Sequence, residues 1–114
     1  MSRSASVADA RSLKLTTVGR RTGRPHTVSL WFVAHEGRVY LCTDDCNSKD
    51  WCRNILAEAA VSVKIGDQTL RGRASLVDDP LLRELLRALR HERYRGAFMG
   101  LAKAFVEVTL EGQG

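Results

Sequence analysis

The sequence predicts an α+β fold, in which about six antiparallel strands form a small β-barrel with two packed helices. Three observations predict it: the chain is short, apolar residues alternate in several brief segments, and only two segments have helical periodicity. With 114 residues the chain has room for one domain. A Rossmann fold is excluded because there is no regular strand–helix–strand order and no G-x-G-x-x-G motif. We expect residues 1–12 to form a flexible arm and residues 13–114 to form the single domain.

Six segments have the alternation or the β-branched and aromatic content of strands. The Gly66-Asp67 pair between the fourth and fifth segments is the clearest hairpin signal in the chain. The expected strands are residues 13–18, 27–34, 39–43, 61–65, 70–76 and 105–110.

Two segments instead repeat apolar residues at helical spacing. The first runs from about Lys49 to Glu58, with Ser48 as a candidate N-cap and Asp50 in its first turn. The second begins at Asp79-Pro80, a cap residue followed by proline at the first helical position, and ends near Arg93.

Composition limits the classes of function. Hydrophobic residues make up 44% of the chain, which excludes disorder as its main state. The longest apolar run, Leu30 to Ala34, is far shorter than the ~20 residues of a membrane helix, so we expect no membrane span. The net charge of +5 favours an anionic partner. Aromatic residues are too few, at 6%, for a nucleic-acid stacking platform, so we expect no nucleic-acid partner.

The three cysteines are Cys42, Cys46 and Cys52. No signal peptide precedes them, and an odd number is typical of free thiols in a reducing compartment, so we expect a cytoplasmic protein. Incidental thiols are the favoured interpretation, and a redox set is the alternative. Their spacing matches no zinc motif, and the three histidines are scattered, so no metal site is expected.

The most informative segment is Gly19 to His26, with the sequence GRRTGRPH. Glycine allows close backbone approach, and Arg20, Arg21 and Arg24 could surround a phosphate. The alternative is a solvated hairpin whose charges point into water. The segment is not a Walker loop, because the GK[ST] ending and the following helix are absent.

The strand expected after this loop alternates between two faces. Val28, Leu30 and Phe32 share one face, whereas Ser29, Trp31 and Val33 share the other. One face should pack into the barrel and the other against a helix, a partner subunit or a flat cofactor. Trp31 is therefore either a core residue or a stacking surface for a cofactor ring.

Residues 15–77 resemble the deazaflavin-dependent nitroreductases, a family of split β-barrel oxidoreductases. The similarity is carried by TTVGRRTGRPHTVSLWFV, GRVYL, VSVKIG and LRGRASLV, and by Trp51 and Asn54 in a W-x-x-N pattern. It implies binding of coenzyme F-420, whose phosphate would be held by Arg20 and Arg21. The following strand would line the deazaflavin ring, with Trp31 at a position where relatives often have tyrosine. Related split barrels bind FMN, usually across a dimer interface.

The chain departs from that family at several positions. His26 stands where relatives often have arginine, and Asp44, Asp45 and Cys46 stand where relatives often have a Ser/Lys/Gly-rich loop. The expected cofactor-binding residues are Arg20, Arg21, Thr22, Gly23, Arg24, His26, Ser29, Trp31 and Trp51. No catalytic residue is assigned.

The expected function is hydride transfer from reduced coenzyme F-420, or from FMN, to a small acceptor such as a quinone, an enone or a nitro compound. The alternative is a non-catalytic carrier of flavin, coenzyme F-420 or haem with the same fold. We expect a homodimer that uses the face of the second strand and part of residues 48–59.

Overall fold

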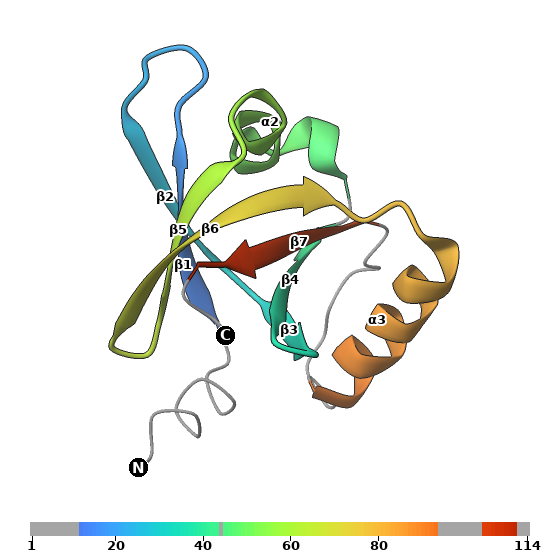
Figure 1. Ribbon diagram of the computed structural model, residues 1–114. Coiled ribbons are helices and arrows are strands. Elements are labelled where there is room, and N and C mark those ends of the chain that lie inside the picture. The colour runs from blue at the N-terminus through green and yellow to red at the C-terminus, as the bar shows by residue number, and fades with distance from the viewer. Residues whose placement is uncertain (1–11, 44, 94–103, 112–114) are drawn as a thin grey trace.

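In the computed structural model, which describes residues 12–43, 45–93 and 104–111, seven antiparallel strands form one strongly curved sheet (Figure 1). The expected α+β split barrel is confirmed, with seven strands in place of about six. The strands are β1 (Leu13–Val18), β2 (Pro25–Leu30), β3 (Phe32–His35), β4 (Arg38–Thr43), β5 (Ala60–Ile65), β6 (Gln68–Leu76) and β7 (Ala104–Leu110).

The additional strand arises because residues 27–34 do not form one continuous strand. β2 pairs with β1, whereas β3 pairs with β4, and Trp31 lies between them. In the sheet order β2-β1-β5-β6-β7-β4-β3, the two strands are at opposite edges. The chain therefore changes edges at Trp31, which brings the two edges of the curved sheet together.

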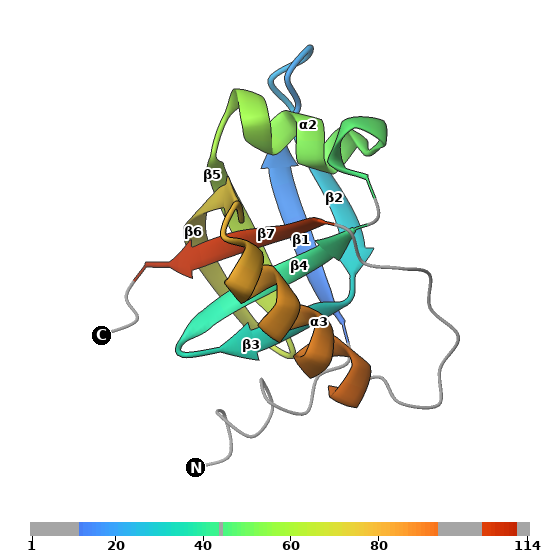
Figure 2. The same ribbon diagram turned by 90° about the vertical axis from the view of Figure 1, so that its right-hand side faces the viewer.

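One end of the barrel is closed by helix α2 (Asp50–Ala57), which follows a short 3₁₀ helix, η1 (Cys46–Ser48) (Figure 2). α2 contributes Trp51, Cys52 and Ile55 to the barrel interior. The inward-facing strand residues there include Leu15, Phe32, Leu41, Val63, Val106 and Val108, all of them fully buried. Their burial supplies the main stabilisation of a domain of this size.

Helix α3 (Pro80–Arg93) lies across the outside of β3 and β7 (Figure 2). A second cluster of Val33, Tyr40, Val77, Leu86 and Phe105 fills this interface. The first two residues of β3 are consequently buried on opposite faces, with Phe32 in the barrel and Val33 beneath α3.

Trp31, between β2 and β3, keeps 37% of its surface exposed. The interpretation of Trp31 as a core residue is therefore wrong.

Within the described residues, no helix combines the length and the apolar character that a membrane span requires. Residues 1–11 of the expected N-terminal arm lie outside the described part of the chain.

Candidate functional site: a cationic pocket between the β1–β2 loop and helix α2

The loop between β1 and β2 is closed by its own backbone. The Gly19 amide donates to the carbonyl oxygen of Arg24, and the Gly23 amide donates to the carbonyl oxygen of Gly19, both at 2.8 Å. Gly23 has a φ of 73°, a left-handed conformation that glycine adopts without steric cost. The loop is thus fixed independently of its arginine side chains, and those of Arg21 and Arg24 are exposed.

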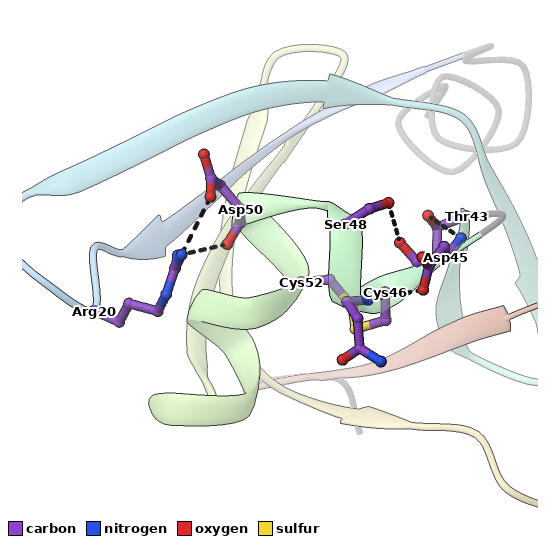
Figure 3. The surroundings of a disulfide bond; sticks show 8 residues. Arg20, Thr43, Asp45, Cys46, Ser48, Asp50 and Cys52 are labelled. Atoms are coloured by element: carbon purple, nitrogen blue, oxygen red, sulfur yellow. Dashed lines mark hydrogen bonds and ion pairs between the residues drawn. A yellow bond between two sulfur atoms is a disulfide. The ribbon is translucent and has the colours of Figure 1, made fainter.

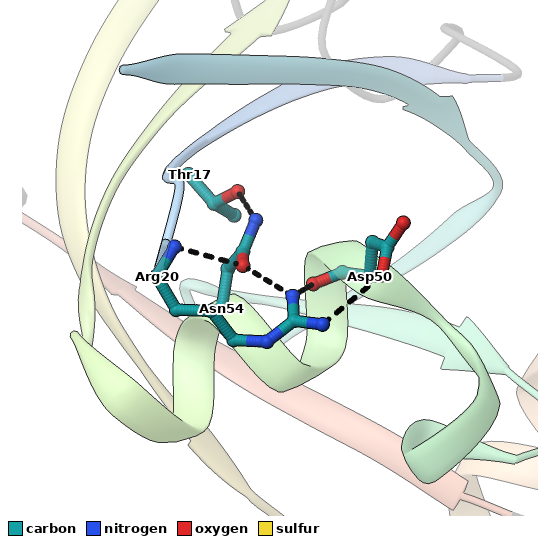
Figure 4. Close-up of polar contacts among 4 residues, drawn as sticks. All are labelled: Thr17, Arg20, Asp50 and Asn54. Atoms are coloured by element: carbon teal, nitrogen blue, oxygen red, sulfur yellow. Dashed lines mark hydrogen bonds and ion pairs between the residues drawn. The ribbon is translucent and has the colours of Figure 1, made fainter. Parts of the chain in front are cut away.

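The side chain of Arg20 instead turns back onto α2 (Figure 4). Asn54 Oδ1 accepts hydrogen bonds from Arg20 Nη1 at 2.8 Å and from the Arg20 amide at 3.2 Å. Arg20 Nη2 forms an ion pair with Asp50 Oδ1 at 3.3 Å. Two residues one helical turn apart therefore hold one guanidinium group, as expected for positions i and i+4 on a helix face.

Asn54 is itself buried, with 3% of its surface exposed. Its Nδ2 donates to Thr17 Oγ1 at 3.1 Å, and the Thr17 hydroxyl donates to the carbonyl oxygen of His26 at 3.4 Å. This network connects β1, β2, α2 and the loop through one buried amide. It satisfies polar groups that would be costly to bury alone.

The loop and α2 enclose a pocket of about 250 Å³. Arg20, Arg21 and Arg24 line it with positive charge and His26 adds an imidazole, whereas Asp50 is the one acidic lining residue among those that the structure describes. Within the described residues, Arg21 and Arg24 form no ion pair. An anion that enters the pocket can therefore form charge-assisted hydrogen bonds with two guanidinium groups that no carboxylate of the described residues neutralises. The remaining lining residues are Gly19, Thr22, Pro25 and Asn54.

Five of the predicted cofactor-binding residues line this pocket, namely Arg20, Arg21, Thr22, Arg24 and His26. The other four lie elsewhere. Gly23 lines a neighbouring hollow of about 320 Å³ with Val18 and Arg71.

Ser29 and Trp51 are separated from the pocket for two different reasons. His26 shares one face of β2 with Val28 and Leu30, so Ser29, three residues later, lies on the opposite face. Ser29 lines another hollow, of about 190 Å³, with Lys14 and Lys64. Trp51 is buried in the core with 5% exposure, so the structure gives it a packing role.

The predicted site residues omitted Asp50 and Asn54. Asn54 was noted as part of the W-x-x-N pattern, and Asp50 was noted as a residue of the first helical turn. Their spacing of four residues was the available signal, because it places both side chains on one face of the helix.

Cys46 and Cys52 form a disulfide bond that links η1 to α2, with their Cα atoms 5.2 Å apart (Figure 3). The interpretation of these two residues as incidental thiols is therefore wrong. The 3₁₀ turn and the first turn of α2 bring the two side chains together, which residue spacing alone does not show. Cys42 is the free cysteine, and burial raises the pKa of its thiol to about 11 although the nearby Arg90 opposes the rise.

Asp45 does not face the arginine loop. Its side chain caps η1 by accepting a hydrogen bond from the Asn47 amide at 3.1 Å. In the described part of the chain, no group of three His, Cys, Asp or Glu side chains is arranged to hold a metal ion.

Comparison with solved structures finds the same fold repeatedly. A structure described as an F420-H2 dependent reductase (FDR-A) has 24% identity and a TM-score of 0.66, covering 86% of this chain and 93% of that chain. HutZ, a heme storage protein from Vibrio cholerae, has 21% identity and a TM-score of 0.77, covering 98% of this chain and 89% of that chain. A structure described as a domain-swapped dimer has 23% identity and a TM-score of 0.68, covering 86% of this chain and 79% of that chain.

No curated protein matches the sequence significantly. A family model does match it, over residues 4–98, and its description is F420H(2)-dependent quinone reductase. This match includes the arginine loop, α2 and most of the barrel. The resemblance to a deazaflavin-dependent split-barrel family is thereby confirmed, and the chain belongs to the F420H(2)-dependent quinone reductase family.

Proposed function

We propose that this protein binds reduced coenzyme F-420 and catalyses the reduction of a small organic acceptor, with a quinone as the first candidate. The observation that carries the proposal is the cationic pocket of about 250 Å³, in which Arg21 and Arg24 have no ion-pair partner among the residues that the structure describes. When bound, the cofactor supplies two electrons as a hydride. Enones and nitro compounds are acceptors of the same two-electron class.

The pocket residues fit the phosphate of such a cofactor. Arg21 and Arg24 would bind it directly, and His26 lines the same pocket. Arg20 has a different role, because Asn54 and Asp50 already occupy its guanidinium group. It would contribute positive charge from a fixed position and hold the loop against α2.

β2 leads from this pocket toward Trp31. Val28 and Leu30 share the inward face of β2 with His26 and are partly buried against the barrel core. Trp31 lies roughly 17 Å from His26 along the strand, at 3.3 Å per residue. We propose that β2 positions the cofactor ring, and that the exposed surface of Trp31 excludes water from the far edge of that ring.

The cofactor assignment is tested by adding coenzyme F-420, FMN and haem separately to the purified protein and measuring binding from each absorbance spectrum. We expect coenzyme F-420 to bind most tightly. Tighter binding of FMN would identify a flavin enzyme, and tighter binding of haem would favour a carrier.

Turnover is tested by following oxidation of reduced coenzyme F-420 with and without a quinone, an enone or a nitro compound. We expect oxidation only when an acceptor is present. The Trp31→Ala variant should lower kcat more than it weakens cofactor binding, because the phosphate contacts persist while ring placement is lost. If the protein binds reduced coenzyme F-420 tightly but oxidises it with none of these acceptors, it is a carrier and not an enzyme.

We also propose that the protein is a homodimer. β2 is an edge strand of the sheet, and Leu56 on the neighbouring α2 keeps 56% of its surface exposed. An edge strand beside exposed apolar surface favours pairing with a second copy. The solved domain-swapped dimer of this fold supports the proposal. Sedimentation at micromolar concentration should show a species of twice 12.7 kDa, and a purely monomeric species would contradict it.

A further inference from the structure

The disulfide and the cationic pocket share one short helix. Asp50 is the first residue of α2 and Cys52 is the third, whereas Cys46 belongs to the preceding η1. Figure 3 shows the disulfide on one side of α2 and the contacts between Arg20 and Asp50 on the other. A covalent bond therefore fixes the helical turn that presents a carboxylate to the pocket.

We propose that Cys46 and Cys52 form a reversible thiol–disulfide site, whose redox state sets the affinity of the pocket for anions. The oxidised pair holds the low-affinity state, and the dithiol gives the high-affinity state. This inference rests on the anion-binding pocket of the proposed function, and it is independent of which cofactor or acceptor the protein uses. In reducing compartments such as the cytosol, disulfides are typically transient and regulatory.

The exchange requires a low-molecular-weight thiol and no other reactant. Cys52 is fully buried, whereas Cys46 keeps 7% exposure, so we expect the incoming thiolate to attack Cys46 Sγ. The Cys46–Cys52 bond breaks, and Cys52 leaves as a thiolate that takes up a proton. A second thiol then attacks the mixed disulfide, which releases the Cys46 thiol and a small-molecule disulfide. A small-molecule disulfide reverses the two steps and reoxidises the pair.

Reduction forces the two sulfur atoms apart. Bonded sulfur atoms are about 2.05 Å apart, whereas atoms in van der Waals contact are separated by roughly 3.5–4 Å. The site is buried and closely packed, so η1 and the first turn of α2 must separate to make room.

The displacement falls on the first turn of α2, although Trp51 and Cys52 pack this turn into the barrel interior. η1 is fixed by Asp45, whose side chain caps it and whose amide donates to Thr43 Oγ1 at 3.3 Å. The far end of α2 is fixed by the buried Asn54 network. The N-cap of α2, Lys49, provides no side-chain cap, and an eight-residue helix has little stability of its own.

A displacement of this turn moves Asp50, which belongs to it, and leaves Asn54, one turn further along the helix, in place. The two Asp50 contacts to Arg20, at 3.3 and 3.5 Å, are already at the long end of hydrogen-bond distances. When they break, the acidic lining residue withdraws from the pocket, and Arg20, which Asn54 still holds, loses its ion-pair partner. Both changes favour anion binding.

The test measures binding of inorganic phosphate to the wild-type protein by NMR, using the Arg20 and Gly23 amide signals. One sample is oxidised with glutathione disulfide and the other is reduced with glutathione, and both reagents are removed before the titration. Thiol counting establishes the state of each sample. We expect the Kd for phosphate to fall at least threefold on reduction.

Three variants make the test specific. Asp50→Asn should bind phosphate with the same affinity in both states, because the carboxylate that the disulfide positions is gone. Cys42→Ser, the matched control, should keep the full redox response. Cys52→Ser should behave as the reduced protein, and the reduced wild type provides the same comparison if this variant does not fold.

Equal phosphate affinity of oxidised and reduced wild-type protein would overturn the proposal, as would a redox response that persists in Asp50→Asn. Failure of the proposed function gives a different result. Coenzyme F-420 would then not bind or not be oxidised, while the redox dependence of phosphate binding would remain.

Discussion

Arg20 and Arg21 are adjacent in the sequence, but their side chains have different environments. Arg20 has 19% side-chain exposure and is held by Asp50 and Asn54, whereas Arg21 is exposed and has no ion-pair partner within the described residues. A substitution at Arg20 therefore removes structural contacts together with charge. A substitution at Arg21 tests anion binding alone.

We predict that Arg21→Ala weakens binding of coenzyme F-420 by about 1.5–3 kcal/mol, the range for hydrogen bonds to charged groups, and leaves the free energy of unfolding unchanged. Fluorescence titration and urea denaturation measure the two quantities. Arg87→Ala, on α3 away from the pocket, is the matched control and should bind normally. Equal small effects of both variants would mean that the loop does not anchor the cofactor.

Asn54 should be more important for stability than its polar character suggests. We predict that Asn54→Ala lowers the free energy of unfolding by about 1–3 kcal/mol, because Thr17 and the Arg20 guanidinium lose a buried partner. It should also weaken anion binding, since Arg20 and its amide are no longer held against α2. Urea denaturation tests the first effect. Arg53→Ala, an exposed neighbour on α2, should change stability by less than about 0.5 kcal/mol.

At the scale of single residues, the sequence showed where charged side chains gather, but it did not show which side chains are buried. Arg20, Arg21, Thr22, Arg24 and His26 could be assigned to one site because they are consecutive or nearly so in one loop. Trp51 was expected to bind the cofactor, but it lies in the core. A tryptophan on an amphipathic helix gives the same sequence pattern whether it packs in a core or stacks on a cofactor ring. Only the barrel interior, which packs against α2, distinguishes the two.

At the scale of elements, the spacing of apolar residues and the residues typical of turns and helix caps identified nearly every strand and both helices. The break at Trp31 was missed because residues on both sides favour strands, and the change concerns which strand each one pairs with. Pairing is a long-range property that local alternation does not encode. The Cys46–Cys52 bond was missed for a related reason, since it depends on the geometry of a three-residue 3₁₀ turn.

A substitution in β6 shows how pairing constrains composition. An added side-chain carbon at Gly72 would lie 2.6 Å from the carbonyl oxygen of Thr109 on the neighbouring β7. Glycine is needed there because the two backbones approach closely, rather than for an unusual conformation. The sequence places this glycine in an alternating strand, and the structure supplies the reason.

The whole molecule is built from two packed layers with different chemistry. The barrel interior is almost entirely apolar, whereas the interface between the sheet and α3 contains Tyr40 and the partly buried thiol of Cys42. Burial raises the pKa of both groups, with Glu107 adding to the effect at Tyr40. The interface between sheet and helix is therefore the part of the fold that is sensitive to alkaline pH.

We predict that stability decreases as the pH rises above about 9. The folded protein keeps the Cys42 proton up to a pKa of about 11, whereas the unfolded chain loses it near 9.0, so the unfolded state binds fewer protons between these values. The contribution is fully present below pH 9 and is lost as the pH rises through 11. At pH 10, one pH unit above the pKa of the unfolded thiol, Cys42 should have lowered the free energy of unfolding by about 1.4 kcal/mol. Urea denaturation at pH 8 and pH 10 measures it, and Cys42→Ala should reduce the slope without abolishing it, because Tyr40 still titrates. An unchanged slope in that variant would show that the thiol is not the group responsible.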